Sequence, residues 1–155
     1  MPATTPTIRS WRPTDPVLDH IAGIYREFAV SFDAGFESDL LDVRKSYEKG
    51  AFWVAELDGE LVGTVGVAPD GPARVIKRIY VAARARRIGL ARTLLRTAAA
   101  WGRYPRTELW SDVRFRGAHR LYLSEGFRPG PVRVLTDPDK SVERYFWRIE
   151  PEGTC

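Results

Sequence analysis

The sequence predicts one α+β domain on a central, mostly antiparallel twisted sheet with helices on both faces. Three observations support this fold class. Strand-like and helical patterns follow one another in a mixed order, and the turn Asp58-Gly59 joins two strand patterns as a hairpin. The chain has 155 residues, enough for one substantial core, so we expect a single domain over residues 1–155.

The expected elements follow the chain in the order β-α-α-β-β-β-α-β-α-β-β. Strand patterns cover 7–11, 51–57, 61–68, 75–81, 107–111, 127–135 (interrupted by prolines) and 142–149. The first helix is expected to start at Asp15, a capping residue that is followed by Pro16 at the first helical position. The apolar stripe of this helix runs over 17–28. A second helix should open at Ser38 or Asp39 and end at Gly50. Two later helices are expected over 90–101 and 118–125.

The most informative segment is the basic turn at 84–92, between a strand pattern and a helix pattern. A strand that opens a helix through such a turn presents free backbone N–H groups, and the helix dipole adds partial positive charge there. The small residues Gly89 and Ala91 let an anion approach the backbone closely. The turn is therefore a candidate phosphate site, and the alternative is an ordinary turn with solvated arginines.

A second segment, 118–127, is typical of a short helix that ends at Gly126, with a strand beginning at Phe127. The spacing Arg-x-x-Gly-x-Ala, followed further on by Ala-x-x-x-Tyr-x-x-x-Gly-Phe, resembles the GNAT superfamily of acetyl-CoA-dependent N-acetyltransferases. The residues that match are Arg86, Gly89, Ala91, Ala118, Tyr122, Gly126 and Phe127. The order of elements along nearly the whole chain is also that of the family.

The resemblance implies acetyl-CoA as the acetyl donor and an amine of a small molecule or peptide as the acceptor, attacking directly in a ternary complex. In the family, the strand ending at Val81 and the strand starting near Thr107 splay apart, and the pantetheine arm inserts between them. Backbone N–H groups around 79–81 would polarise the thioester carbonyl. The cofactor contacts implied are Ile79, Tyr80, Val81, Arg86, Arg87, Ile88, Gly89, Leu90, Ala91, Arg92, Ala118 and Tyr122.

Tyr122 is the candidate catalytic residue, as general acid or hydrogen-bond donor to the departing thiolate. The alternative is a core tyrosine with a satisfied hydroxyl. The general base stays open, because a carboxylate at its ordinary pKa is a poor base for an alkylammonium. The candidates are a chain of water molecules or one of Glu56, Glu108, Asp112 and His119.

One position departs from the family pattern, because Phe115 stands where many members carry asparagine. A side-chain amide contact to the cofactor arm is thus in doubt, and Arg114 or Arg116 could contribute instead. The family resemblance also implies that the loops 31–37 and 136–140 border the acceptor pocket. Asp137 and Asp139 in the second loop could attract a cationic amine, or they could be solvated.

Composition narrows the function classes. A net charge of +4 suits a phosphorylated cofactor or a polyanion. The basic turn lacks stacking aromatics, which argues against a nucleic-acid-binding module, while a catalytically silent acyl-CoA sensor remains an alternative. We expect no metal, because Cys155 is the one cysteine and the two histidines are far apart.

The chain shows no apolar run long enough for a membrane span and no secretory signal pattern at its start. We therefore expect a cytoplasmic protein, and the segment 110–115 looks like a variant seen in bacterial members of the family. The oligomeric state stays open, with a homodimer among the alternatives.

Overall fold

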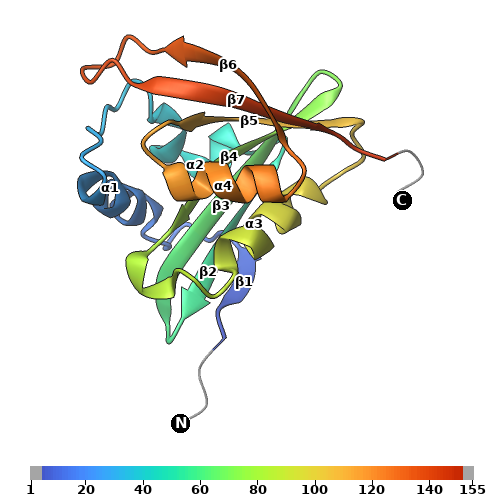
Figure 1. The fold of residues 1–155 in the computed structure, drawn as a ribbon. Helices are drawn as coiled ribbons and strands as arrows, with labels where there is room; N and C mark the ends of the chain where they lie inside the picture. Colours follow the sequence, from blue (N-terminus) through green and yellow to red (C-terminus); the bar gives the residue numbers. More distant parts are fainter. Residues whose placement is uncertain (1–4, 152–155) are drawn as a thin grey trace.

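The computed structural model describes residues 5–151, which form one seven-stranded sheet in the order β1-β2-β3-β4-β5-β7-β6 (Figure 1). The strands are β1 (Thr7–Ser10), β2 (Ala51–Leu57), β3 (Glu60–Asp70), β4 (Ala73–Val81), β5 (Arg106–Asp112), β6 (Arg128–Val134) and β7 (Val142–Ile149). Strands β4 and β5 pair in parallel, and every other neighbouring pair in this sheet is antiparallel. The mostly antiparallel sheet predicted from the sequence is confirmed.

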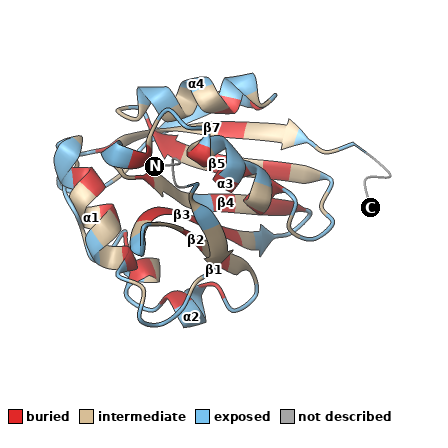
Figure 2. Cartoon of the chain, turned by 90° about the horizontal axis from the view of Figure 1, so that it is seen from below, coloured by how far each residue is buried: buried red, intermediate tan, exposed pale blue. Residues whose placement is uncertain are grey.

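The helices cover both faces of the sheet, as predicted. They are α1 (Val17–Glu27), α2 (Val43–Ser46), α3 (Leu90–Ala99) and α4 (Arg116–Ser124), with short 3-10 turns at Ser38–Leu40 and Ala83–Ala85. Leu94 and Leu95 of α3 and Tyr122 of α4 share one buried cluster with Phe146 of β7. The helices α1 and α2 pack in a second cluster on the other face. Figure 2 shows α4 above the buried central strands and α2 below them.

Strands β4 and β5 pair over only three residues each, Ala73–Val75 against Arg106–Glu108. The buried Arg74 secures this short junction. Its Nε donates to Thr107 Oγ1 at 2.8 Å, and its Nη1 donates to the carbonyl of Trp101, just beyond α3, at 2.6 Å. Beyond this junction β4 and β5 no longer pair, so the sheet opens between them on one side of the junction.

Two local predictions were wrong. The helix expected from Ser38 or Asp39 to Gly50 is divided into the 3-10 turn and α2, because Asp42 accepts a hydrogen bond from Lys45 N at 3.1 Å and starts a new helix there. Asp15 does not cap α1, whose N-cap is Pro16 without a side-chain bond. The Asp15 carboxylate is paired with the Arg9 guanidinium, a charged partner that forms stronger hydrogen bonds than a helix N–H.

Candidate active site

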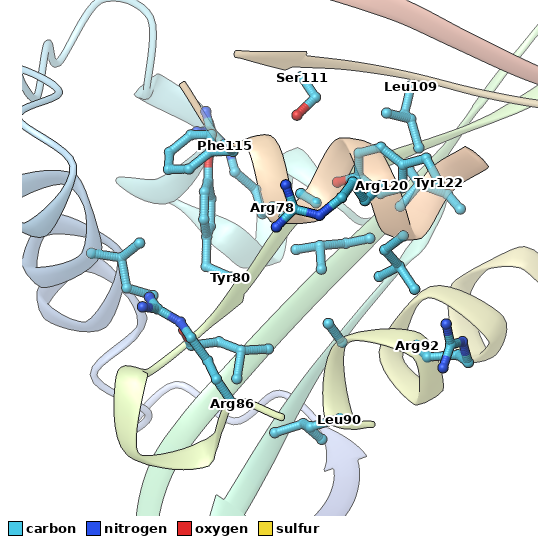
Figure 3. Close-up of a pocket in the computed structure, with 18 of the residues that line it drawn as sticks. Arg78, Tyr80, Arg86, Leu90, Arg92, Leu109, Ser111, Phe115, Arg120 and Tyr122 are labelled. Atoms are coloured by element: carbon cyan, nitrogen blue, oxygen red, sulfur yellow. The ribbon is translucent and has the colours of Figure 1, made fainter. Parts of the chain in front are cut away.

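A cavity of about 490 Å³ occupies the opening between β4 and β5 (Figure 3). Residues from β4, the following turn, the start of α3, β5 and α4 all line it. Of the sequence-predicted cofactor contacts, the structure brings together Ile79, Tyr80, Val81, Arg86, Arg87, Gly89, Leu90, Ala91, Arg92, Ala118 and Tyr122. Ile88 does not line the cavity, because its side chain points to solvent and is 58% exposed.

A β-bulge in β4 shapes one wall of the cavity. The pairing with β3 runs from Gly66 opposite Lys77 to Thr64 opposite Tyr80, so Arg78 and Ile79 together face one residue. Arg78 has a φ of 61°, a left-handed conformation that is unfavourable for arginine. The conformation is held on both sides, since Thr64 Oγ1 donates to the Arg78 carbonyl at 2.8 Å and Asp39 binds the guanidinium. The bulge takes the Arg78–Ile79 backbone out of regular pairing beside the cavity.

The other end of the cavity is formed by the turn into α3. Gly89 is the N-cap of α3 with a φ of 82°, and no side chain caps the helix. The first N–H groups of α3 therefore have no partner within the helix, and the first turn carries no acidic residue. Since Gly89, Leu90 and Ala91 line the cavity, these donors and the positive end of the helix dipole are available to an anion in it.

The side chain of Arg86 is used elsewhere. Its guanidinium forms an ion pair with Glu27 of α1, its Nε donates to the Val81 carbonyl at 3.0 Å, and it lies over the ring of Phe28. Arg86 thus joins the turn to α1, and its contribution to a bound ligand would come from the backbone. Arg120 and Gly117 of α4, which sequence reasoning missed, do line the cavity.

Tyr122 lies on α4 at the cavity wall and is only 4% exposed. Burial raises the pKa of its phenol, while an interaction with the Ser111 hydroxyl lowers that pKa by less. Ser111 also contacts His119 Nε2 at 3.1 Å. Sequence reasoning missed Ser111, which is buried on the same face of β5 as Thr107 and Leu109.

The three carboxylates proposed as general bases are all hydrogen-bonded to arginine side chains. Glu56 is hydrogen-bonded to Arg9 at the far edge of the sheet, and Glu108 is held by Arg106 and Tyr145. Asp112 lines the cavity but accepts two hydrogen bonds from the Arg114 guanidinium, at 3.0 and 2.7 Å, and one from the Arg114 N–H at 2.9 Å.

The fourth proposed base, His119, does not line the cavity itself. Burial lowers the pKa of its imidazole, which keeps the ring neutral, and the ring packs against Phe146.

Phe115, at the position where an amide was expected, packs its ring on Phe28 and Tyr80 with centroid distances of 5.0 and 5.7 Å. This part of the cavity wall is therefore aromatic (Figure 3). Arg114 and Arg116, suggested as substitutes for the amide, do not line the cavity, and Arg114 is held by Asp112 and Ser141.

The two loops expected to border an acceptor pocket contact each other. The Ser31 N–H and hydroxyl donate to Asp139 at 2.7 and 2.8 Å. Asp137 is buried in its own loop, where it accepts hydrogen bonds from Ser141. Among the described residues, neither loop lines the cavity, and the expectation that the two loops border an acceptor pocket stays a prediction.

A buried polar network lies behind Tyr80. The hydroxyls of Tyr80 and Tyr25 are 3.1 Å apart, and Tyr25 donates to Glu37 Oε1 at 3.2 Å. Arg78 Nη1 donates to the Tyr25 hydroxyl at 3.0 Å, and its Nη2 donates to Asp39 at 2.6 Å. The network connects the cavity wall to α1 and to the loop that follows it.

The site thus combines a splayed β4–β5 pair, an uncapped helix start at one end of the cavity and a buried tyrosine at the other. This arrangement can be compared with known proteins. The family model described as "Acetyltransferase (GNAT) domain" matches residues 48–129. The chain belongs to this family. Acyl transfer from acetyl-CoA is the general reaction of GNAT acetyltransferases, an enzyme family.

Relatives and solved structures agree with the family assignment. A probable N-acetyltransferase camello of Xenopus tropicalis is 34% identical over 73% of this chain and 56% of its own length. This chain spans about half the length of the curated relatives that it matches. A GNAT-family acetyltransferase of Staphylococcus aureus shares the fold with a TM-score of 0.79 at 20% identity, covering 94% and 99% of the two chains.

An acetyltransferase of Bacillus anthracis, solved in complex with acetyl coenzyme A, superposes with a TM-score of 0.61 at 20% identity, covering 71% of this chain and 70% of its own. Acetyl-CoA therefore binds to a protein of this fold. Within the described part of our chain, no group of three or more potential metal ligands is present, and no helix has the length and hydropathy of a membrane span.

Proposed function

We propose that this GNAT domain transfers an acetyl group from acetyl-CoA to a primary amine of a small molecule or peptide, by direct attack in a ternary complex. The observation that carries the proposal is that one cavity joins the uncapped start of α3 to the buried Tyr122 through the opening between β4 and β5. A ligand with anionic groups at one end and a reactive group at the end of a slender arm fits such a site.

The residues of the cavity suit acetyl-CoA in their chemistry. The N–H groups at the start of α3 would hold the pyrophosphate, and the exposed Arg87 adds positive charge beside them. Gly89 has no Cβ to obstruct the approach. When bound, acetyl-CoA supplies an acetyl group activated as a thioester.

The remaining chemistry falls to the opposite end of the cavity. Backbone N–H groups around 79–81, beside the bulge, would donate to the carbonyl oxygen as negative charge grows there. Tyr122 would donate a hydrogen bond to the sulfur. Because burial raises its pKa, the phenol stays protonated at neutral pH and acts as a donor instead of releasing its proton outright.

A screen of primary amines that follows the release of free thiol from acetyl-CoA tests the proposal, with calorimetry of coenzyme A binding beside it. We expect micromolar to submillimolar binding, the ordinary range for an enzyme substrate, and thiol release that depends on at least one amine. Binding without amine-dependent release would instead support the acyl-CoA sensor. Absence of binding would reject both functions.

The same screen is designed to identify the acceptor amine. The cytoplasmic location, the bacterial origin, the homodimer and the single domain over residues 1–155 stay predictions.

A further inference from the structure

A chain of three hydrogen-bonded side chains leads from the cavity wall into the protein. Tyr80 lines the cavity, its hydroxyl lies 3.1 Å from that of Tyr25, and the Tyr25 hydroxyl lies 3.2 Å from Glu37 Oε1. Tyr25 is on α1, Tyr80 is on β4, and Glu37 is in the loop after α1. The chain thus joins three separate segments, and its inner end is a carboxylate that is only 8% exposed.

The direction of the hydrogen bonds follows from the donors present. Arg78 Nη1 can only donate, so the Tyr25 oxygen accepts from it, at 3.0 Å. The single hydroxyl proton of Tyr25 is given to Glu37. Tyr80 must therefore donate its own proton to Tyr25. Its oxygen also interacts with the Arg78 side chain, and the second lone pair can accept a proton from another group.

Glu37 is the carboxylate best placed to receive that proton. Burial raises its pKa, while the N–H of Asp33, which donates to Oε2 at 2.7 Å, and the charge of Arg78 lower it. The guanidinium of Arg78 forms its ion pair with Asp39, which Tyr47 also holds. A buried carboxylate outside an ion pair is a stronger base than an exposed one, because a proton relieves its desolvation.

The other buried carboxylates of the described chain lack this combination. Asp112 forms an ion pair with Arg114, and Asp137 is bound within its own loop, away from the cavity. Asp112 lines the cavity but is paired with the Arg114 guanidinium, and Asp137 reaches the wall through Ser141 and that same arginine, a permanently charged group that does not relay a proton.

We propose, resting on the acetyltransferase function above, that Tyr80, Tyr25 and Glu37 form a proton relay that deprotonates the acceptor ammonium. The ammonium N–H proton passes to the Tyr80 oxygen, the Tyr80 proton passes to Tyr25, and the Tyr25 proton passes to Glu37. The acceptor becomes a neutral amine, both tyrosines end neutral, and Glu37 becomes a carboxylic acid. After product release the proton returns along the same chain to water.

Kinetics of Tyr25→Phe as a function of pH test the relay. A variant without it uses only the free amine, whose fraction falls tenfold per pH unit below the amine's pKa. We expect kcat/KM to be reduced about a hundredfold two pH units below that pKa, a general-base magnitude, and to approach the wild-type value near it. Tyr47→Phe is the matched control, because its hydroxyl bonds Asp39 and lies off the path to Glu37.

The acceptor is the amine returned by the screen, with ethanolamine as a fixed comparison probe. A wild-type to Tyr25→Phe ratio that does not change with pH would assign the network a structural role and overturn the relay, while acetyl transfer by the wild type would keep the proposed function intact. Glu37→Gln combined with Tyr25→Phe should be no slower than either single variant, because both interrupt one path. Multiplied defects would contradict a shared path.

A second readout needs no turnover. Carbon-13 NMR of the Glu37 carboxyl should show a titration midpoint above that of an ordinary glutamate, and Tyr25→Phe should move it, whereas Tyr47→Phe should leave it nearly in place. A Glu37 that titrates like an exposed glutamate would reject the relay whatever the kinetics.

Discussion

At the scale of single residues, burial decides what Tyr122 can do. Tyr122 is 4% exposed and the pKa of its phenol is raised, so it keeps its proton at neutral pH. A raised pKa makes it a poor source of a free proton but preserves a hydrogen-bond donor inside a medium of low dielectric constant. A donor of this kind is most valuable where negative charge appears during the reaction.

Tyr122→Phe should therefore lower kcat by roughly a hundred- to a thousandfold, the usual cost of one transition-state donor. The dissociation constant of coenzyme A and the melting temperature should change little, because the ring keeps its contacts with Phe127 and Phe146. Tyr47→Phe removes a buried hydroxyl away from the cavity. This variant should leave kcat nearly unchanged and lower the free energy of unfolding by about 1 kcal/mol. Normal turnover by Tyr122→Phe, measured where chemistry limits the rate, would remove Tyr122 from the mechanism.

Sequence reasoning located Tyr122 because a fixed spacing surrounds it, and it failed where a side chain's partner lies far along the chain. Arg86 belongs to the same kind of motif, yet Glu27 of α1 holds its guanidinium. The sequence around Ser111 does not indicate a function, because serines in strands are also common on the protein surface. Its importance comes from α4, which brings Tyr122 and His119 beside it.

At the scale of elements, the strand–turn–helix from β4 to α3 concentrates the anion-binding capacity. The left-handed conformations of Arg87 and Gly89, with φ of 65° and 82°, direct the chain into α3 without a side-chain cap. An ordinary surface helix would have gained about 1 kcal/mol from a serine or aspartate at that position. The missing cap leaves donors free for a ligand, which is the arrangement expected from the basic turn in the sequence.

Gly89→Val should weaken coenzyme A binding by at least tenfold, because a branched side chain at φ 82° would obstruct the N–H groups of α3. Gly71→Val is the matched control. Gly71 also has a positive φ and open space around a Cβ, but it lies in the β3–β4 turn and does not line the cavity. Both variants should lose similar stability from backbone strain. Equal coenzyme A affinity in the two folded variants, by calorimetry, would show that the turn is not the phosphate site.

Element boundaries were predictable where the pattern was strong, and less so in the segment between α1 and β2. Every predicted strand is present, because alternation and turn residues define it locally. The helix expected from 38 or 39 to 50 is interrupted because the Asp42 side chain competes for a backbone N–H. A short polar residue inside an apolar stripe can either face solvent or start a new helix, and periodicity does not distinguish the two.

At the scale of the whole molecule, the cavity depends on where strands β4 and β5 stop pairing. The local periodicity of the sequence does not predict that point. The opening lies beyond the three-residue junction of β4 and β5, which the buried Arg74 holds to Thr107 and to the end of α3. The Tyr80–Tyr25–Glu37 chain likewise joins segments far apart in sequence. Only the resemblance to a family predicted the splayed strands, and nothing in the sequence indicated the relay.

Stability as a function of pH is also a property of the whole molecule, and here two histidines oppose one glutamate. Burial lowers the pKa of both His20 and His119, so the unfolded chain binds more protons than the folded one just below pH ~6.5. The free energy of unfolding therefore falls as the pH drops through that range. Glu37 acts in the opposite sense, because its raised pKa lets the folded protein hold a proton that the unfolded chain releases.

The double variant His20→Gln, His119→Gln should lose less stability than the wild type between pH ~6.5 and ~5, since each fully uncompensated histidine contributes up to about 1.4 kcal/mol per pH unit. Glu37→Gln should lose more as the pH falls further toward the ordinary glutamate pKa of ~4.3, because it removes the opposing group. Denaturant unfolding at a series of pH values measures both slopes, and the slopes are informative even if a variant is less stable at every pH. Parallel curves for all three proteins would mean that other groups dominate the proton uptake and that the two histidines are not held neutral by the fold.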